Sequence, residues 1–247
     1  WGEHASAKRD YTLKATAGTD YKIRIEYMQA GAEALLRFDL GIYRHISPEM
    51  VVDRVKEADI VIFAGGISPS LEGEEMYSVN SPGFAGGDRT SIELPQVQRD
   101  ILKALKKAGK KVVFVNCSGS AVALVPEMES CDAILQAWYP GQSGGLAVAD
   151  VLFGDFNPSG KLPVTFYKNT DQLPDFEDYS MKNRTYRYMT EAPLFPFGYG
   201  LSYTTFDISK GRLNKKTISA GQGLNFKVNV KNTGTREGQE VVQLYIS

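Results

Sequence analysis

The sequence predicts an α/β fold, an α/β sandwich in which a mainly parallel sheet carries helices on both faces, with partial β segments at both ends of the chain. Two observations lead to this prediction. Four short runs are rich in β-branched and other apolar residues, and helical patterns or glycine-rich turns separate them. Strands that alternate with helices form a parallel sheet, so we expect all four runs in one sheet. The four runs are residues 59–67, 111–118, 133–140 and 162–167.

Three helices are predicted between or before these runs. The first covers residues 47–58, and the hydroxyl of Ser47 can cap it ahead of a proline in the first turn. The second covers residues 94–109 and carries one apolar stripe at helical spacing. The third covers residues 145–153, and we expect Ser143 to cap it.

The composition of the 247-residue chain excludes several classes of function. Its hydrophobic content of 43% and charged content of 23% are ordinary for a soluble globular protein. The net charge of −1 predicts neither nucleic acid nor membrane as a partner, and no apolar run approaches the roughly 20 residues that span a bilayer. Two isolated histidines and two cysteines without metal-binding spacing predict no metal site.

Both ends of the chain show the alternation of apolar and polar residues that is typical of β-strands. Residues 21–27 alternate near the start, and residues 224–232 and 240–247 alternate near the end. Neither end has the roughly seven strands that a complete β-sandwich needs. The three expected regions are residues 1–45, 46–205 and 206–247.

Two glycine-containing motifs suggest other activities, and the sequence argues against both. Residues 141–145 read GQSGG, which matches the nucleophile elbow of serine hydrolases, but that fold needs a histidine after its serine and none follows His45. Residues 64–66 read AGG after a predicted strand, but the further glycines of a dinucleotide-binding loop are absent.

An acidic loop follows the first predicted strand and carries Glu72, Glu74 and Glu75. Ligands of parallel α/β sheets bind at the carboxyl ends of the strands, where this loop begins. Clustered carboxylates repel one another, which raises the proton affinity of at least one of them and suits a general acid. From composition alone, a solvated acidic loop without chemistry explains the cluster better.

Residues 137–167 and 71–98 resemble the second domain of glycoside hydrolase family 3, which contains β-glucosidases and β-xylosidases. The second stretch resembles the loop that carries the family's catalytic acid. It contains a Glu-Gly pair at Glu72, a Gly-Asp-Arg triplet that ends at Arg89, and a Leu-Pro-x-x-Gln helix start that ends at Gln98. The matching position makes Glu72 the general acid/base. Glu74 is the alternative, because the neighbouring acidic residues permit a small shift of register.

The resemblance also implies what lies around this domain. Residues 1–45 resemble the tail of an inserted protective-antigen-like β-domain, and residues 206–247 the start of a fibronectin type III-like domain. Family members are retaining exo-glycosidases that act on β-linked glucosyl or xylosyl groups, need no cofactor, and use an aspartate nucleophile on a preceding barrel domain. Alone, this chain is therefore expected to be inactive, and its partners are a β-linked oligosaccharide and that barrel. The resemblance implies a periplasmic or secreted protein.

Four further expectations concern single residues and surfaces. Trp138 and Tyr139 end a predicted strand, so they are expected at the rim of the site, where aromatic rings stack on sugars. Asp88 and Arg89 are expected to pair with each other or to cap the next helix, with contacts to sugar hydroxyls as the alternative. Glu72 is expected on an exposed loop without a basic partner. Incomplete β regions would favour self-association.

A function from another class remains open at this point. The chain could be a non-catalytic carbohydrate-binding or scaffold fragment, which fits the absence of a recognisable nucleophile and the incomplete β regions. The sequence does not decide between glucosides and xylosides, because the missing barrel would hold the sugar that is cleaved.

Overall fold

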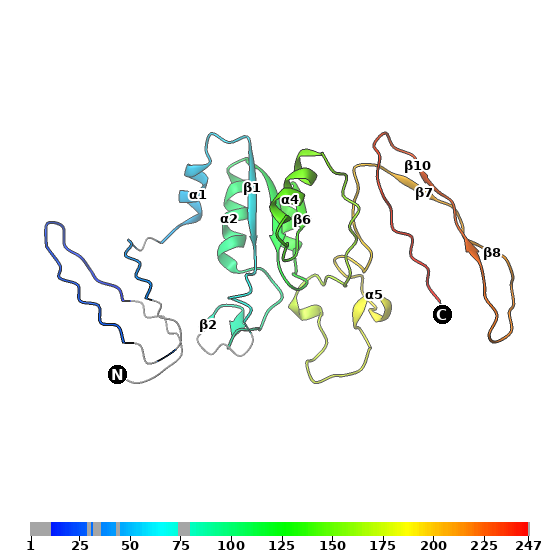
Figure 1. Ribbon diagram of the computed structural model, residues 1–247, viewed down its shortest axis with the longest axis horizontal. Coiled ribbons are helices and arrows are strands. Elements are labelled where there is room, and N and C mark those ends of the chain that lie inside the picture. The colour runs from blue at the N-terminus through cyan, green and yellow to red at the C-terminus, as the bar shows by residue number, and fades with distance from the viewer. Residues whose placement is uncertain (1–10, 29–30, 32–35, 43–44, 74–79, 247) are drawn as a thin grey trace. The chain divides into compact units, whose positions relative to one another are not determined.

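The computed structural model describes residues 11–28, 31, 36–42, 45–73 and 80–246, and it separates the chain into two compact units (Figure 1). The units are Trp1–His45 and Ile46–Ser247. Glu74 and Glu75 lie outside the described residues. The second unit holds every helix and strand that the structure assigns, so it positions any site in the described part of the chain.

A parallel sheet of three strands forms the centre of the second unit. Its strands are β1 (Ile60–Gly66), β5 (Lys111–Cys117) and β6 (Ala133–Gln136), in the order β1-β5-β6. Ile60 pairs with Lys111 and Val113 pairs with Ala133. The α/β class is confirmed, and three of the four predicted runs lie in one sheet.

The prediction for the fourth run is wrong. Residues 162–167 stay outside the parallel sheet. They lie beside the aromatic segment that ends at Tyr199. Phe166 forms an antiparallel bridge with Phe195, and the Leu162 amide donates to the Tyr199 carbonyl at 2.8 Å. Pro163 explains the difference, because proline has no N–H to donate and is confined to strand edges.

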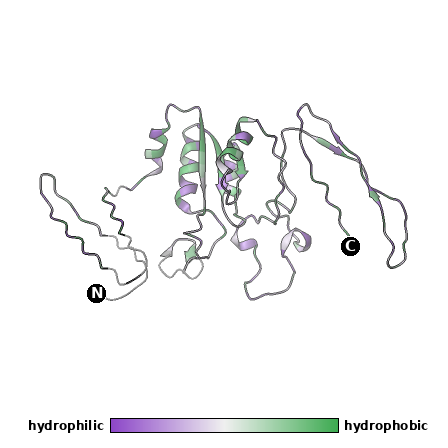
Figure 2. Cartoon of the chain, in the orientation of Figure 1, coloured by the Kyte–Doolittle hydropathy of each residue, from purple (hydrophilic) through white to green (hydrophobic). Residues whose placement is uncertain are grey.

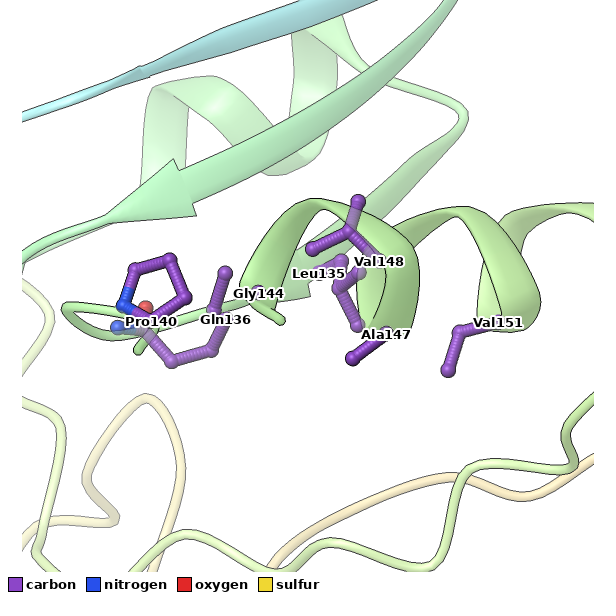
Figure 3. Close-up of a pocket in the computed structure, with 8 residues that line it drawn as sticks. Leu135, Gln136, Pro140, Gly144, Ala147, Val148 and Val151 are labelled. Atoms are coloured by element: carbon purple, nitrogen blue, oxygen red, sulfur yellow. The ribbon is translucent and has the colours of Figure 1, made fainter. Parts of the chain in front are cut away.

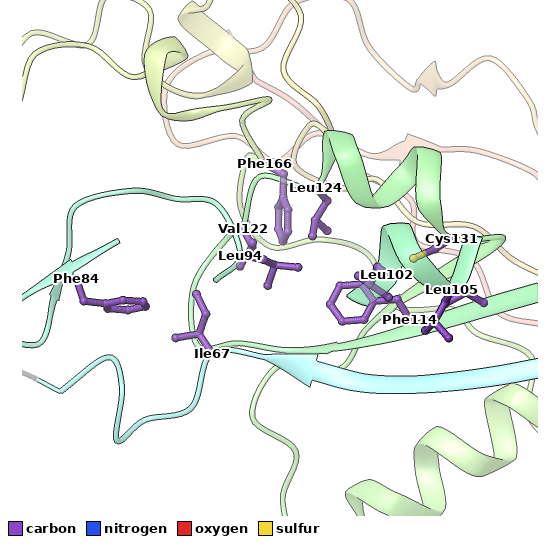
Figure 4. Packing of buried hydrophobic residues seen from close by; sticks show 11 residues of the cluster. Ile67, Phe84, Leu94, Leu102, Leu105, Phe114, Val122, Leu124, Cys131 and Phe166 are labelled. Carbon is purple, nitrogen blue, oxygen red and sulfur yellow. The ribbon is translucent and has the colours of Figure 1, made fainter. Parts of the chain in front are cut away.

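One face of the sheet is covered by α2 (Gln96–Lys107), and α1 (Pro48–Arg54) and α3 (Val125–Ser130) pack against α2. Figure 2 shows α2 with both hydrophobic and hydrophilic residues along it, as expected of a helix with one buried side. Leu102 and Leu105 of α2 are fully buried with Phe114 of β5 (Figure 4). Val112 of β5 is fully buried in the same cluster. This apolar layer fixes the orientation of β1 and β5, because burying such side chains stabilises the fold by about 1.5–3 kcal/mol each.

The opposite face carries α4 (Gly144–Phe153). Successive side chains of a strand point to opposite faces of the sheet, and Leu135 of β6 is on the face toward α4. It lines a small apolar hollow with Ala147, Val148 and Val151 of α4 (Figure 3). The helix does not cover β1 on this face, since Ile60 and Ile62 are 56% and 51% exposed. Helices therefore lie on both faces of the sheet, as predicted. On the face that carries α4, the outer strand β1 stays exposed.

The ends of the helices follow local chemistry. The Ser47 hydroxyl accepts the Met50 amide at 3.4 Å, so the predicted cap of α1 is present. Ser143 occupies the capping position of α4, but its side chain makes no capping hydrogen bond, which corrects the prediction. The glycine that follows Ser143 is needed for space, because a Cβ at Gly144 would lie 2.1 Å from the Pro140 Cβ.

Short elements complete the second unit. The loop after β1 forms a small antiparallel sheet, and the C-terminal part forms two antiparallel pairs, β7 with β10 and β8 with β9. Lys161 pairs with Glu240 at 2.9 Å, with both side chains about 85% buried, which joins the C-terminal part to the segment after α4. These elements are β2 (Asn80–Ser81), β3 (Phe84–Ala85), β4 (Asp88–Arg89), η1 (Thr170–Gln172), α5 (Thr185–Tyr188), β7 (Phe206–Ile208), β8 (Arg212–Leu213), β9 (Phe226–Lys227) and β10 (Val230–Asn232).

In the first unit, the structure assigns no strand among the residues that it describes, so the β-domain expected there stays a prediction. Residues 21–27 belong to no assigned strand, and the Thr19 amide closes a turn on the Thr16 carbonyl at 3.2 Å. Ile23 and Ile25 are exposed.

One carboxylate joins the start of α2 to the segment after residue 167. Glu93 accepts hydrogen bonds from the Ser91 hydroxyl, from the Thr170 amide at 2.9 Å and from the Thr170 hydroxyl at 2.6 Å. Burial raises the pKa of Glu93, but these hydrogen bonds outweigh it and lower the pKa from 4.5 to about 2. The ionised form is therefore favoured by folding.

We expect Glu93→Gln to lower the free energy of unfolding by about 1–3 kcal/mol at pH 7, because it weakens hydrogen bonds to a charged group. A lowered pKa contributes stability that is fully present above about pH 5 and is lost as the pH falls toward about 2. Urea unfolding at pH 7, 4 and 3 measures this. The exposed Glu57→Gln should keep the acid dependence of the parent, and the same dependence in both variants would contradict the assignment.

Candidate active site

The candidate site lies at the carboxyl end of β1, where the chain leaves the sheet. The Ile67 amide still donates to the Cys117 carbonyl at 2.9 Å, and the Ser68 carbonyl then accepts the amides of Leu71 and Glu72 at 3.0 and 3.1 Å. This turn reverses the chain and returns Glu72 to the edge of the sheet. The predicted acid is thus placed by backbone hydrogen bonds at the end of the sheet where α/β proteins bind ligands.

The start of this turn is held by a glycine and a glutamine. The Gln98 side chain of α2 accepts the Gly66 amide at 2.8 Å and donates to the Gly66 carbonyl at 2.7 Å. Gly66 has a φ of 125°, and a Cβ there would lie 1.9 Å from the Cys117 carbonyl oxygen. Only glycine fits this close approach.

The Glu72 carboxylate has three polar neighbours. Its Oε1 accepts the Ser120 hydroxyl at 2.8 Å and lies 3.7 Å from a terminal nitrogen of Arg89. Its Oε2 lies 3.3 Å from the Tyr139 hydroxyl. The side chain is 23% exposed, so it is reachable from solvent. The expectation of an exposed Glu72 without a basic partner is wrong, because β4 brings Arg89 against it.

Arg89 is held by several oxygens rather than by Asp88. It donates to the Ser120 hydroxyl at 2.7 Å, to the Ala121 carbonyl at 3.1 Å and to the Ser91 carbonyl at 3.1 Å. Burial lowers the pKa of Arg89 and the charges of Glu72 and Glu93 act against this, so the guanidinium stays positive. Asp88 is exposed on β4, and neither the expected Asp88–Arg89 pair nor a helix cap is present among the described contacts.

Tyr139 and Trp138, both expected at the rim, take different places. The Tyr139 hydroxyl reaches Glu72 and the Ile67 carbonyl, the latter at 2.8 Å, and the ring is 42% exposed. Burial, together with the negative charge of Glu72, raises the pKa of the Tyr139 hydroxyl. Trp138 has a φ of 56° and packs edge-on against Phe166 at 6.0 Å between ring centroids. The described packing places Trp138 beside the core.

Sequence reasoning did not find Ser120. It follows β5 in the run Ser118-Gly119-Ser120, and the Ser118 hydroxyl donates to the Ser120 carbonyl at 2.9 Å. Ser118 is fully buried and also accepts the Gln136 amide at 3.2 Å, so a buried polar network fixes the Ser120 loop. Two serines flanking a glycine at the end of a buried strand were the signal that could have indicated this position.

A hollow of about 360 Å³ adjoins Tyr139 and Gly66, and Gln98 and Ser68 contribute polar groups to it. The hollow of Figure 3 lies elsewhere, between β6 and α4, and Leu135, Ala147 and Val148 are among the residues that line it. Convergent polar groups beside a hollow are typical of ligand sites. In the described residues, no three His, Cys, Asp or Glu side chains lie close enough to hold a metal ion, and no helix is long and apolar enough to cross a membrane.

Residues 5–203 match the family model described as the glycosyl hydrolase family 3 C-terminal domain. The match covers most of the chain, and the parallel sheet with helices on both faces agrees with the fold that the resemblance implied. The chain belongs to glycoside hydrolase family 3.

Curated relatives carry the names of enzymes from this family. A xylan 1,4-β-xylosidase of Xylanibacter ruminicola is 59% identical over 95% of this chain, and a periplasmic β-glucosidase of Salmonella typhimurium is 41% identical over 81% of it. The chain spans 27% of the length of each. Thus the similarity extends across this chain but covers only about a quarter of those enzymes.

Solved structures give the same result. A β-glucosidase of Erythrobacter marinus superposes with a TM-score of 0.66 at 37% identity, over 77% of this chain and 25% of that one. A β-glucosidase mutant of Listeria innocua in complex with laminaribiose superposes with a TM-score of 0.59 at 30% identity, over 77% and 27%. The fold is shared with structures of the same family, one of which holds a sugar.

We expect Gly66→Ala to lower the free energy of unfolding by about 3 kcal/mol or more, because the new methyl group overlaps the Cys117 carbonyl. Gly109→Ala is the matched control, since Gly109 also has a positive φ but no atom lies near its added Cβ. The control should lose only about 1–2 kcal/mol. Thermal and urea unfolding measure both variants, and equal losses would show that the close approach is unimportant.

Proposed function

We propose that this chain is the part of a retaining, exo-acting β-glycosidase that supplies the general acid/base, Glu72. The observation that carries the proposal is a solvent-reachable carboxylate at the carboxyl end of β1, held by Ser120, Arg89 and Tyr139. The names of the relatives support the reaction class. Glu93 is a poor alternative acid, because Ser91 and Thr170 occupy its carboxylate oxygens.

In this mechanism the protonated Glu72 donates its proton to the glycosidic oxygen as the bond to the leaving group breaks. The ionised Glu72 then accepts a proton from the water that releases the sugar. A carboxylate nucleophile must lie across the sugar ring, about 5–5.5 Å from the acid in a retaining enzyme. We propose that the barrel domain of the same polypeptide provides that nucleophile, in the three quarters of the relatives' length that this chain does not span.

The substrate proposed is a β-linked oligosaccharide with a glucosyl or xylosyl group at its non-reducing end. The 59% identity to a protein named xylan 1,4-β-xylosidase favours xylosyl groups. A periplasmic or secreted location is proposed as well, and the relative named periplasmic β-glucosidase supports it. The other candidate function, a non-catalytic carbohydrate-binding fragment, is kept because the chain spans only a quarter of those enzymes.

In the full-length glycosidase that carries this segment, we expect Glu72→Gln to lower kcat/KM for xylobiose by about 10³-fold, because its leaving group must be protonated. The loss for 4-nitrophenyl β-xyloside should be at least tenfold smaller, since nitrophenolate leaves without a proton. The exposed Glu129→Gln is the matched control and should change neither rate. Equal losses on both substrates would point to another acid, and Glu74→Gln would be measured next.

The purified chain alone should not hydrolyse 4-nitrophenyl β-xyloside or β-glucoside, because both carboxylates are required across one sugar ring. Absorbance of released nitrophenolate measures this against the full-length enzyme. Turnover by the chain alone that disappears in Glu72→Ala would show that a second carboxylate works within these residues, with Asp88 the first to replace.

A further inference from the structure

The Tyr139 hydroxyl lies between two oxygens and has one proton to donate. The Ile67 carbonyl oxygen is 2.8 Å away and the Glu72 Oε2 is 3.3 Å away. A phenol donates one hydrogen bond and accepts others, so it cannot donate fully to both oxygens at once. The shorter contact identifies the Ile67 carbonyl as its stronger acceptor in this structure, which leaves the phenol oxygen able to accept from Glu72.

The other oxygen of Glu72 has a different partner. The Ser120 hydroxyl accepts from Arg89 at 2.7 Å, so its own proton is free to point at Glu72 Oε1, 2.8 Å away. Arg89 and Ser120 thus present only donors to Oε1. A proton on Oε1 would face these donors, whereas a proton on Oε2 faces the phenol oxygen of Tyr139. The geometry therefore favours Oε2 as the oxygen that carries the catalytic proton.

We propose that Tyr139 is a positioning residue that serves both protonation states of Glu72. When Glu72 is protonated, Oε2 donates to the phenol oxygen while Tyr139 donates to the Ile67 carbonyl. When Glu72 has given its proton to the leaving group, the Tyr139 O–H turns from the Ile67 carbonyl to the ionised Oε2. The phenol keeps its proton throughout, so only the direction of a hydrogen bond changes. This inference rests on the proposed role of Glu72 as acid/base.

Two features keep the phenol suited to this task. Burial and the charge of Glu72 raise the pKa of Tyr139, so the phenol remains a donor when Glu72 is ionised. The ring is also placed by Gly119, where an added Cβ would lie 2.5 Å from the Tyr139 Cε2. A larger residue at position 119 would therefore displace the ring while leaving its hydroxyl intact.

The test uses the full-length glycosidase and a series of aryl β-xylosides with leaving groups of different pKa. Tyr139→Phe keeps the ring, and hence any stacking on sugar, but removes the hydroxyl. We expect kcat/KM to fall about tenfold for the poorest leaving groups and little for the best, so the plot against leaving-group pKa becomes steeper. Tyr203→Phe, which also removes a tyrosine hydroxyl donating to a carbonyl, at 2.7 Å to Val151, should leave the slope unchanged.

A double-mutant cycle separates this role from a structural one. If Tyr139 acts through Glu72, Tyr139→Phe should cost nothing further in the Glu72→Gln background. An equal loss in both backgrounds would overturn the inference while leaving Glu72 as the acid. If Glu72→Gln itself has no dependence on the leaving group, the proposed function fails instead, so the two failures are distinguishable.

A second variant keeps the inference testable if Tyr139→Phe folds poorly. Gly119→Ala retains the phenol but moves its ring, and we expect the same steeper dependence on leaving-group pKa, again absent in the Glu72→Gln background. An unchanged slope in Gly119→Ala, with circular dichroism showing a folded enzyme, would contradict a positioning role for the ring.

Discussion

The contact on which the rest of the site depends is the close approach of Gly66 to the end of β5. The backbone of β1 comes so near the Cys117 carbonyl that no side chain fits, and the Gln98 side chain binds both polar groups of Gly66. The peptide that follows is thereby directed out of the sheet at a defined angle. The contact at Gly66 therefore fixes the positions of the Ile67 carbonyl and of the turn that carries Glu72.

The polar cluster is a consequence of parallel strands ending together. Glu72 follows β1, Ser120 follows β5 and Tyr139 follows β6, so three loops deliver their side chains to one edge. Arg89 joins them from the small antiparallel sheet in the first of these loops. Residues separated by up to 67 positions therefore meet, and the Glu72 carboxylate lies beside the positive Arg89 and two hydroxyl groups.

Much of the fold was predictable because local signals and burial agree. The β-branched runs of β1, β5 and β6 are buried on the face toward α2, and that burial makes them recognisable as strands of one sheet. Residues 162–167 have the same composition, but Pro163 removes the donor that a central strand needs, and their partner is an aromatic segment about thirty residues later. Composition alone does not reveal which partner a strand will have.

The candidate site was predictable only in part. A motif indicated Glu72, and its place at a strand end follows from general rules for parallel sheets. Asp88 and Arg89 were expected to pair with each other or to cap the next helix, yet the Arg89 partners Ser120 and Ala121 lie more than 30 positions away. Ser120 carries no chemical signal by itself, and only the buried hydrogen bonds behind it give it a fixed place.

The ion pair between Lys161 and Glu240 has a consequence for how the chain reaches its native state. The three parallel strands are complete by residue 136, whereas this contact waits for a partner 79 positions beyond Lys161. Long loops are slow to close, so contacts between distant residues form late. On a ribosome that adds about 5–20 residues per second, the sheet is available on the order of ten seconds before Glu240 emerges. During that interval the edge that carries Glu72 is assembled while the C-terminal β segments are still being made.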